Sequence, residues 1–363
     1  MRLLSFLLLP VLLIPKIYSQ TAPEIRYIDA SQLTMIGKAL PTSHLYHRID
    51  TTVYGKLTAS ENQQARCSAG LALTFKTNST SIELLPTYKW EHKKDNMTGI
   101  AAAGFDLYIK RENKWVYANS GAPQVRNKEF TIIKDMDTTE KECLLYLPIY
   151  SELENLKIGI QQTATIKAIP NPFKSKVVFF GSSFTQGTSA SRPGMSYPMQ
   201  IERNLDVHVC NLGFAGNSKL QPYFAELIAD IDADTFVFDA FSNPSEEIIR
   251  KRLVSFLEII SKKHKETPLI FVETIHRGNT NFNLSSRRHE EKKKEAAKEI
   301  MVELMQKYPN VYFIESPLPE SISDDTSADG VHPSDLGYYY WANNLGDKLN
   351  KILNLKTKMT NQK

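Results

Sequence analysis

Apolar and polar positions alternate over short stretches in the first half of the chain. The segments that show this two-residue period are GLALTFKT, SIELLPTYKW, GFDLYIKRENKWVYA and CLLYLPIY. Turn-forming stretches such as KTNSTS and KRENK separate them, and no segment here has the pattern of a convincing amphipathic helix. This half therefore predicts an antiparallel β-sandwich domain over residues 20–168.

The pattern changes after the proline- and lysine-containing connector IKAIPNPFKSK. Apolar β-type runs then alternate with helical stretches. The runs lie at 177–180, 207–214, 235–241, 269–275 and 311–314, and the helical stretches at 197–205, 220–231, 244–264, 285–308 and 333–353. Strands that are apolar on both faces and separated by helices predict a parallel sheet covered on both sides, an α/β domain over residues 175–355.

The N-terminal stretch MRLLSFLLLPVLLIPKIYSQ has the composition of an export signal. One arginine precedes an apolar run, and the small residue Ser19 precedes Gln20. The run is too short and too interrupted by proline for a membrane-spanning helix, although an uncleaved anchor is the alternative. We expect a signal peptide over residues 1–19, and therefore a periplasmic or secreted protein with no membrane span after cleavage. No cysteine follows the run, so we expect no lipid anchor.

The amino-acid composition limits the classes of function that this protein can have. A chain of 363 residues with 42% hydrophobic content has room for two globular domains. The formal charge of +4 is spread over the whole chain, so we expect no nucleic-acid partner. Cys67, Cys143 and Cys210 are widely spaced with no histidine cluster nearby, which indicates neither a metal site nor a disulfide framework. Buried thiols are the expectation, with a Cys67–Cys143 bridge as the alternative.

Candidate chemistry lies in the loops that follow the predicted parallel strands, because ligands bind at the carboxyl ends of such strands. The first loop, GSSFTQG, places serines at the start of a helix or turn. The loop has no lysine at the position that the phosphate-binding motif GxxxxGK[ST] requires. Ser183 also occupies the position of the second glycine in the dinucleotide-binding motif GxGxxG. Thr185 likewise holds the last glycine position of an α/β-hydrolase elbow. These three site types are excluded.

Three later loops supply partners for such a serine. GFAGN contains Gly216, FSNP contains Asn243, and DGVH carries Asp329 three residues before His332. A histidine can take the proton of Ser183, an aspartate can orient the imidazole, and N–H donors can stabilise the oxyanion of a tetrahedral intermediate. A bare glycine turn and a helix cap are the alternatives for Gly216 and Asn243.

These four ordered blocks resemble the SGNH (GDSL-like) hydrolase family, which is named for Ser, Gly, Asn and His. The match spans residues 176–353 and implies a flavodoxin-like three-layer α/β/α domain that needs no cofactor or metal. It implies Ser183 as nucleophile and His332 as base, supported by Asp329. It also implies an oxyanion hole made of the backbone N–H groups of Ser183 and Gly216 and the side-chain amide of Asn243.

The segments ASRPGMSYP and GFDLY resemble a bacterial exported subgroup of this family, in which a β-rich domain with a GxDLY motif precedes the hydrolase. Asp106 and Tyr108 of this motif are candidate substrate-binding residues at the mouth of the site, and a purely structural role is the alternative.

Two of the four blocks depart from the family pattern, at three positions. Ser182 replaces the usual aspartate before the nucleophile. Phe241 and Pro244 replace the Gly and Asp of the usual GxND block. None of these three positions supplies a catalytic group in the family's mechanism.

The sequence thus predicts an exported serine esterase that removes small acyl groups, most notably acetyl, from carbohydrate. The carbohydrate preference rests on the resemblance and on export, since no residue around Ser183 specifies it. Acyl transfer to a sugar acceptor by the same triad is one alternative. A non-catalytic carbohydrate-binding protein with a decayed site is the other.

Overall fold

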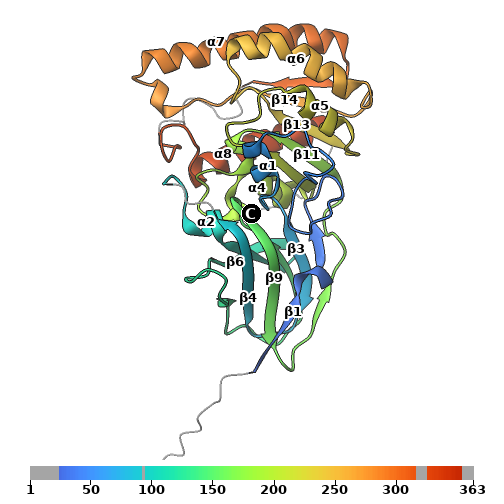
Figure 1. The fold of residues 1–363 in the computed structure, drawn as a ribbon, viewed down its shortest axis with the longest axis vertical. Coiled ribbons are helices and arrows are strands. Elements are labelled where there is room, and N and C mark those ends of the chain that lie inside the picture. Colours follow the sequence, from blue (N-terminus) through green and yellow to red (C-terminus); the bar gives the residue numbers. More distant parts are fainter. Residues whose placement is uncertain (1–23, 92–94, 316–324, 354–363) are drawn as a thin grey trace, which may run out of the picture.

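The computed structural model describes residues 24–91, 95–315 and 325–353. The expected signal peptide, residues 1–19, lies outside these ranges. Figure 1 shows an elongated molecule in which a β-rich part and an α/β part follow one another along the long axis. Over the described ranges, no helix combines the length and apolarity needed to cross a bilayer.

The β-rich part, called the β-domain below, consists of two antiparallel sheets. One has the order β1 (Ile25–Asp29), β9 (Ser151–Gln161), β4 (Ile82–Glu91) and β7 (Phe130–Ile133). The other has the order β10 (Ile166–Ala168), β3 (Ala72–Thr77), β8 (Lys141–Tyr146), β5 (Phe105–Arg111) and β6 (Lys114–Gly121), with β2 (Thr34–Ile36) on β3. Leu84 and Ile158 of the first sheet share one buried core with Phe75 and Leu145 of the second. The predicted β-sandwich is therefore confirmed.

The β-domain also contains two short helices that the sequence pattern did not indicate, α1 (Ala59–Ala65) and α2 (Gly99–Ala103). At 7 and 5 residues they are too short to repeat an apolar face. Their starts are determined by local hydrogen bonds instead. Thr58 and Glu61 form a capping box at α1, and Thr98 accepts from the Ala101 N–H at α2.

The α/β part is built on a five-stranded parallel sheet, as predicted. Its order is β12 (His208–Gly213), β11 (Lys176–Gly181), β13 (Thr235–Asp239), β14 (Leu269–Val272) and β15 (Val311–Ile314). The first strand along the chain lies between the second and the third, which is the flavodoxin-like order. Gly181 pairs with Gly213 on one side and with Asp239 on the other. The loops that leave these three strands therefore emerge side by side.

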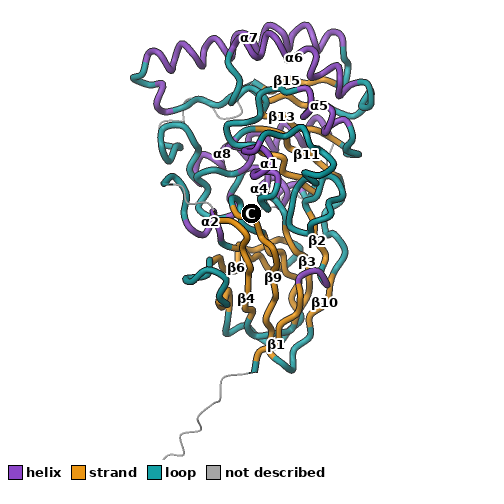
Figure 2. Tube along the Cα trace, viewed as in Figure 1, coloured by secondary structure: helices purple, strands orange, loops and turns teal. Residues whose placement is uncertain are grey.

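Helices cover both faces of this sheet (Figure 2). α5 (Pro222–Ala229), α6 (Glu246–Ser261) and α7 (Leu284–Lys307) lie on one face, and α4 (Tyr197–Leu205) and α8 (Asp335–Leu353) on the other. Successive residues of β11 alternate between the two cores: Val178 packs with the first group of helices and Phe179 with the second. The predicted three-layer α/β/α arrangement is confirmed.

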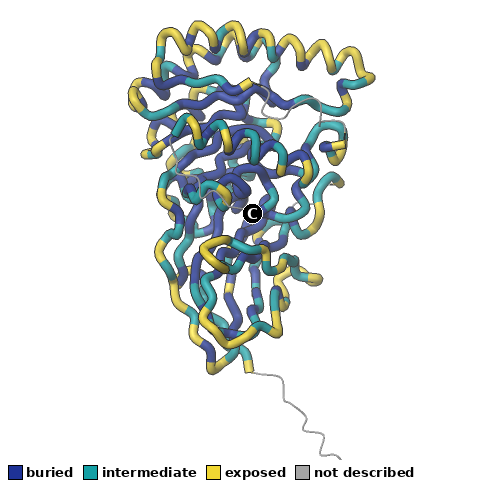
Figure 3. Tube along the Cα trace, turned by 180° about the vertical axis from the view of Figure 1, so that it is seen from behind, coloured by how far each residue is buried: buried dark blue, intermediate teal, exposed yellow. Residues whose placement is uncertain are grey.

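The two parts of the molecule share buried surface, so the dark interior in Figure 3 continues from one into the other. Tyr146 of β8 belongs to the same core cluster as Tyr197 of α4 and Trp341 of α8. Arg48 of the β-domain is buried and donates to the carbonyls of Asn211 and Gly213, both at 2.9 Å. The β-domain is thus packed directly against the sheet edge and helices that carry the candidate site.

All three cysteines are buried thiols, as predicted, and the alternative Cys67–Cys143 bridge is not formed. Burial raises the pKa of Cys143 and of Cys210 to about 12. These two side chains therefore stay protonated near neutral pH and behave as small apolar groups.

Candidate active site

The candidate nucleophile begins a short helix directly after β11. This helix, α3 (Ser183–Gln186), is capped by Ser182, whose hydroxyl accepts from the Phe184 N–H at 3.1 Å. It ends at Gly187, whose φ of 108° lies in the left-handed region. A first helical residue has no intrahelical acceptor for its backbone N–H, so the N–H of Ser183 is left available as a donor at the start of α3.

His332 lies on a tight turn before α8. The Ala328 N–H donates to the His332 carbonyl at 2.8 Å, and Ser327 pairs with Pro333 across the turn. This geometry brings the His332 Nε2 to 3.0 Å from the Ser183 Oγ. The Phe184 ring packs edge-on against the imidazole, with ring centroids 5.6 Å apart, and so limits its rotation.

Asp329 holds the other side of the imidazole. Its Oδ2 lies 2.7 Å from the His332 Nδ1, while its Oδ1 accepts the N–H groups of Val331 and His332 at 2.9 and 2.7 Å. Burial alone raises the pKa of the Asp329 carboxyl, but these hydrogen bonds together hold it well below its usual range. An ionised Asp329 favours the proton on Nδ1, which leaves the Nε2 lone pair for the hydroxyl of Ser183.

A further side chain at this site, Asn96, was missed by the sequence reasoning. Asn96 precedes α2 in the β-domain, and its Nδ2 lies 2.8 Å from the Asp329 Oδ2 and 3.4 Å from the His332 Nδ1. The backbone carbonyl of Asn96 accepts a hydrogen bond from the Ser189 hydroxyl at 2.8 Å. No local pattern marks this asparagine, because only the packing of the two domains brings it to Asp329.

Gly216 and Asn243 lie on the loops next to Ser183. The Phe214 N–H donates to the Gly181 carbonyl at 2.7 Å, which joins the loop after β12 to the end of β11. Gly216 has a φ of +73°, and a side chain added there would meet nothing within 4 Å, so this part of the loop is open. The Asn243 Nδ2 donates to the Ser218 Oγ at 3.0 Å and to the Phe214 carbonyl at 3.3 Å.

The helix-cap alternative for Asn243 does not apply, because the residue that caps α6 is Ser245. The Ser245 hydroxyl accepts from the Ile248 N–H two residues beyond the asparagine. The Asn243 amide is therefore directed toward the loop of Gly216 and Ser218 rather than toward the first turn of α6.

A buried carboxylate contacts the loop that carries Ser183. The position before Ser183, where the family usually has an aspartate, is occupied here by Ser182. Asp239, at the end of β13, accepts the Ser182 N–H at 3.1 Å and the Thr185 hydroxyl at 3.2 Å. The hydroxyls of Ser182 and Ser242 donate to it as well. Burial raises the pKa of Asp239 in spite of these donors. The neighbouring strand thus supplies an acid to the loop, which the sequence reasoning did not detect.

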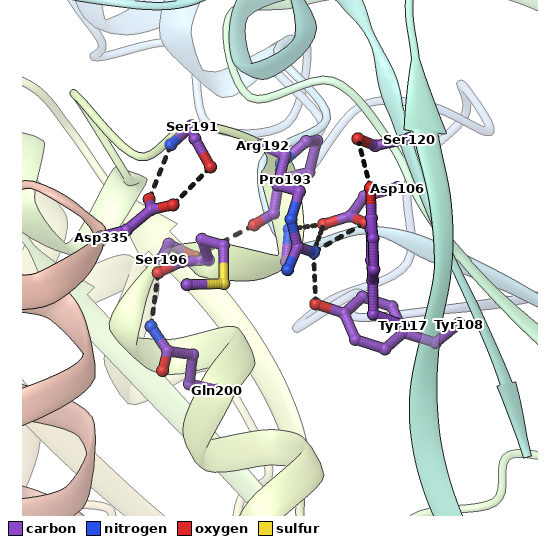
Figure 4. Close-up of polar contacts among 12 residues, drawn as sticks. Asp106, Tyr108, Tyr117, Ser120, Ser191, Arg192, Pro193, Ser196, Gln200 and Asp335 are labelled. Carbon is purple, nitrogen blue, oxygen red and sulfur yellow. Dashed lines mark hydrogen bonds and ion pairs between the residues drawn. The ribbon is translucent and has the colours of Figure 1, made fainter. Parts of the chain in front are cut away.

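The structure locates Asp106 and Tyr108 at the joint between the domains (Figure 4). Arg192, just before the short helix η2 (Pro193–Met195), donates to the two Asp106 oxygens at 2.9 and 2.7 Å and to the Tyr108 hydroxyl at 2.6 Å. The Gly194 N–H donates to Asp106 at 2.8 Å. Asp106 is 0% exposed and Tyr108 4%, so their polar atoms are committed to protein contacts rather than to an open mouth of the site.

The site as a whole contains the groups that acyl transfer requires: a hydroxyl, an imidazole oriented by a carboxylate, and adjacent N–H donors. Across the part of the chain that the structure describes, no cluster of three or more His, Cys, Asp or Glu side chains is arranged to hold a metal ion.

Two family models match the sequence one after the other. Residues 174–351 match the GDSL-like lipase/acylhydrolase family. Residues 25–166 match the GxDLY domain, described as the N-terminus of SGNH-hydrolase-type esterases. A search of curated proteins gives no match.

Solved structures extend the similarity over both domains. A GDSL-like lipase from Bacteroides ovatus ATCC 8483 is 39% identical, with a TM-score of 0.89 over 92% of this chain and 100% of that one. Two more distant structures share the fold: the salicylyl-acyltransferase SsfX3 from a tetracycline biosynthetic pathway (17% identity, TM-score 0.71, 90% and 97% covered) and the acetyl xylan esterase Est2A from the rumen bacterium Butyrivibrio proteoclasticus (12%, 0.54, 91% and 100%). The chain belongs to the GDSL-like lipase/acylhydrolase family of ester hydrolases and carries the N-terminal domain of its SGNH-type esterases.

Proposed function

We propose that this protein is an exported serine esterase that removes small acyl groups, acetyl above all, from carbohydrate esters. The observation that carries the proposal is the 3.0 Å contact between the Ser183 Oγ and the His332 Nε2, with Asp329 behind the imidazole. Export is supported by the composition of residues 1–19. The carbohydrate preference is supported by export and by the fold shared with an acetyl xylan esterase.

In the acylation step, the Ser183 Oγ attacks the carbonyl carbon of the ester while the His332 Nε2 takes the hydroxyl proton. The tetrahedral intermediate then collapses, the bond between the acyl carbon and the alcohol oxygen breaks, and His332 returns the proton to that oxygen. The alcohol leaves and the acyl group stays on Ser183. Asp329 remains ionised throughout and stabilises the imidazolium.

The negative charge of the intermediate needs donors directed at its oxygen. The backbone N–H groups of Ser183 and Gly216 and the Nδ2 of Asn243 serve this role in the proposal. The longer of the two Asn243 contacts, 3.3 Å to the Phe214 carbonyl, is the one that an oxyanion would replace, while the Ser218 contact holds the amide in place. A single donor of this kind contributes about 3 kcal/mol to the lowering of the barrier.

In the deacylation step, His332 takes a proton from a water molecule, whose oxygen attacks the acyl carbon. Collapse of this second intermediate breaks the bond to the Ser183 Oγ, which recovers its proton from His332, and the carboxylic acid leaves. A sugar hydroxyl in place of water would make the same acyl-enzyme a transferase. Product analysis in the presence of free glycan acceptors separates these two outcomes.

The proposal is tested on the full chain with Ser183→Ala and, as its matched neighbour, Ser182→Ala. We expect Ser183→Ala to lose at least about 1000-fold in kcat on p-nitrophenyl acetate and to lose labelling by a fluorophosphonate. Ser182→Ala should keep the labelling, because that hydroxyl bonds Asp239 rather than His332. Full esterase activity of Ser183→Ala would exclude this mechanism. A chain-length series of acyl esters then tests the preference for small acyl groups.

A further inference from the structure

A polar hollow of about 350 Å³ lies where the loop after β14 leads through η3 (Gly278–Thr280) into α7. Six polar residues line it: Arg277, Asn279, Ser285, Ser286, His289 and Glu290. None of them belongs to the four motif loops from which the catalytic proposal is built.

The inner end of this hollow touches the loops of the candidate triad. The Arg277 guanidinium lies over the Phe184 ring, 5.5 Å from its centroid, and Phe184 follows Ser183 directly. The Asn279 N–H donates to the Gly330 carbonyl at 2.8 Å, and Gly330 follows Asp329. A ligand in the hollow would therefore lie next to an ester held at Ser183.

A second hollow, of about 290 Å³, continues the first one outward. Both are lined by Ser285 and His289, and the second also reaches Arg288 and Lys292 of α7 and Glu246 and Glu247 at the start of α6. The two hollows together are called the α7 groove below. Its lining residues are Glu246, Glu247, Arg277, Asn279, Ser285, Ser286, Arg288, His289, Glu290 and Lys292. They come from the loop after β14, next to the triad loops, and from the N-terminal parts of α6 and α7.

Some polar groups of the groove are available to a ligand, whereas Glu290 is paired with Lys293 and Arg277, and Glu246 with Arg250. Within the described residues, the side chains of Asn279, Ser285, Ser286 and His289 make no hydrogen bond to protein, and the buried Nε of Arg277 has no partner. The polar groups of Asp106 and Tyr108, in contrast, are all bonded to the Arg192 segment. A buried donor without a partner, such as the Arg277 Nε, is most readily explained by a water or ligand oxygen that satisfies it.

The groove carries charges of both signs, which argues against an ionic ligand. Cationic and anionic side chains face it in similar number: Arg277, Arg288 and Lys292 against Glu246, Glu247 and Glu290. Hydroxyl, amide and imidazole groups line the groove as well, so its lining can both donate and accept hydrogen bonds. Phe282, three residues before Ser285 and 95% exposed, adds an apolar surface at the turn into α7.

We propose that the α7 groove binds the neutral, polyhydroxylated alcohol part of the substrate, a short glycan chain whose acyl group is presented to Ser183. The inference rests on the proposed esterase function and adds to it a binding site on the leaving-group side. Hydroxyl groups that both donate and accept match the lining, and the two adjoining hollows provide room for more than one sugar ring.

Binding is tested without catalysis in the full-length Ser183→Ala protein, with xylotriose as the probe in a calorimetric titration. We expect Asn279→Ala and His289→Ala in this background to weaken binding about 10-fold each, because each removes hydrogen bonds to the sugar. Gln306→Ala, an exposed position near the C-terminal end of α7, is the matched control and should leave binding unchanged. Unchanged binding in both groove variants would overturn the inference. Tighter binding of trigalacturonate than of xylotriose would overturn the choice of a neutral ligand.

Kinetics provide the second test, with Ser183 intact. We expect His289→Ala to lower kcat/KM for acetylated xylotriose about 10-fold more than for p-nitrophenyl acetate, mainly through KM, because the p-nitrophenyl group of the ester has no free hydroxyl for the groove. Equal losses on the two substrates would contradict the groove while leaving the esterase mechanism intact. Turnover that persists in Ser183→Ala would contradict the mechanism, and the titration would still test the groove.

Discussion

Asn96 of the β-domain donates a hydrogen bond to Asp329 of the α/β domain, with the Nδ2 2.8 Å from the Oδ2. The same carboxylate oxygen lies 2.7 Å from the Nδ1 of His332. The residue that orients the candidate base is therefore itself held by the other domain. The β-domain contributes to the site through this positioning contact.

Asn96→Ala tests that contact. We expect kcat/KM on p-nitrophenyl acetate to fall about 10-fold, mainly through kcat. The hydrogen bond helps to lower the pKa of Asp329, so this pKa should rise in the variant and activity should fall away at a higher pH on the acid side. Gln124→Ala, an exposed amide in the same domain, is the control. A uniform loss of activity with an unshifted pH profile would indicate a merely structural role.

Asn243→Ala tests the proposed oxyanion donor. We expect kcat to fall about 100-fold with little change in KM, because the donor acts on charge that develops in the transition state. Ser218→Ala removes only the anchor of the amide and should cost a few-fold at most. Equal effects of the two substitutions in steady-state kinetics would show that Asn243 only supports the loop.

Asp239→Ala tests the carboxylate behind the nucleophile loop. The substitution leaves the Ser182 N–H and the Ser242 hydroxyl without their buried acceptor, so we expect the free energy of unfolding to fall by about 3 kcal/mol. The labelling of Ser183 by a fluorophosphonate should slow in the protein that remains folded. Asp232→Ala, at an exposed position just before β13, should change neither quantity. Urea unfolding and labelling rates measure both, and an unchanged labelling rate would separate Asp239 from the site.

Arg192→Ala tests the joint of Figure 4. It leaves the buried Asp106 carboxylate without its hydrogen-bonded cation, although the buried Arg203 still lies near it, so we expect a loss of about 3 kcal/mol in guanidinium unfolding. Asp106→Asn in the Arg192→Ala background should recover part of this loss, because the uncompensated charge is then absent. A double variant less stable than Arg192→Ala alone would contradict this expectation, because the carboxylate would then stabilise the joint even without Arg192, for example through the Gly194 N–H.

Glu202→Gln tests a buried acid of α4 that accepts from the Tyr146 hydroxyl at 2.6 Å. Burial raises the pKa of Glu202 to about 7, from an ordinary value of 4.5. Between these pH values the folded protein keeps the proton that the unfolded chain has lost, so this group makes stability fall as pH rises from 4.5 to about 7. We expect the difference in unfolding free energy between wild type and variant to change by up to about 3 kcal/mol between pH 5 and pH 8, in favour of the variant at the higher pH. A constant difference would contradict the raised pKa.

The periodicity of the apolar residues and the order of the motifs predicted many of the strands and helices of this protein. The apolar run 177–180 lies within β11, and the run 311–314 coincides with β15. The predicted helical stretch 197–205 coincides with α4. Such patterns are readable because each element must bury one face or both, whatever its neighbours are. Ser183 and His332 were predicted as site residues from local features and motif order, since a strand-to-helix turn and a glycine-containing loop before a helix can be read from the sequence.

Tertiary structure alone decided which polar groups meet. Asn96 and Asp329 are separated by 233 positions in the chain, and Asp239 reaches Ser182 only because β13 pairs with β11. Asp106, which the motif placed at a candidate site mouth, lies buried beside Arg192 because the two domains pack there. A single polar side chain has no periodicity to read, and its role depends on the partner that folding brings within hydrogen-bond distance. The sequence by itself determined the strands, the helices and the order of the motifs, and the packing of the domains decided what holds the site together.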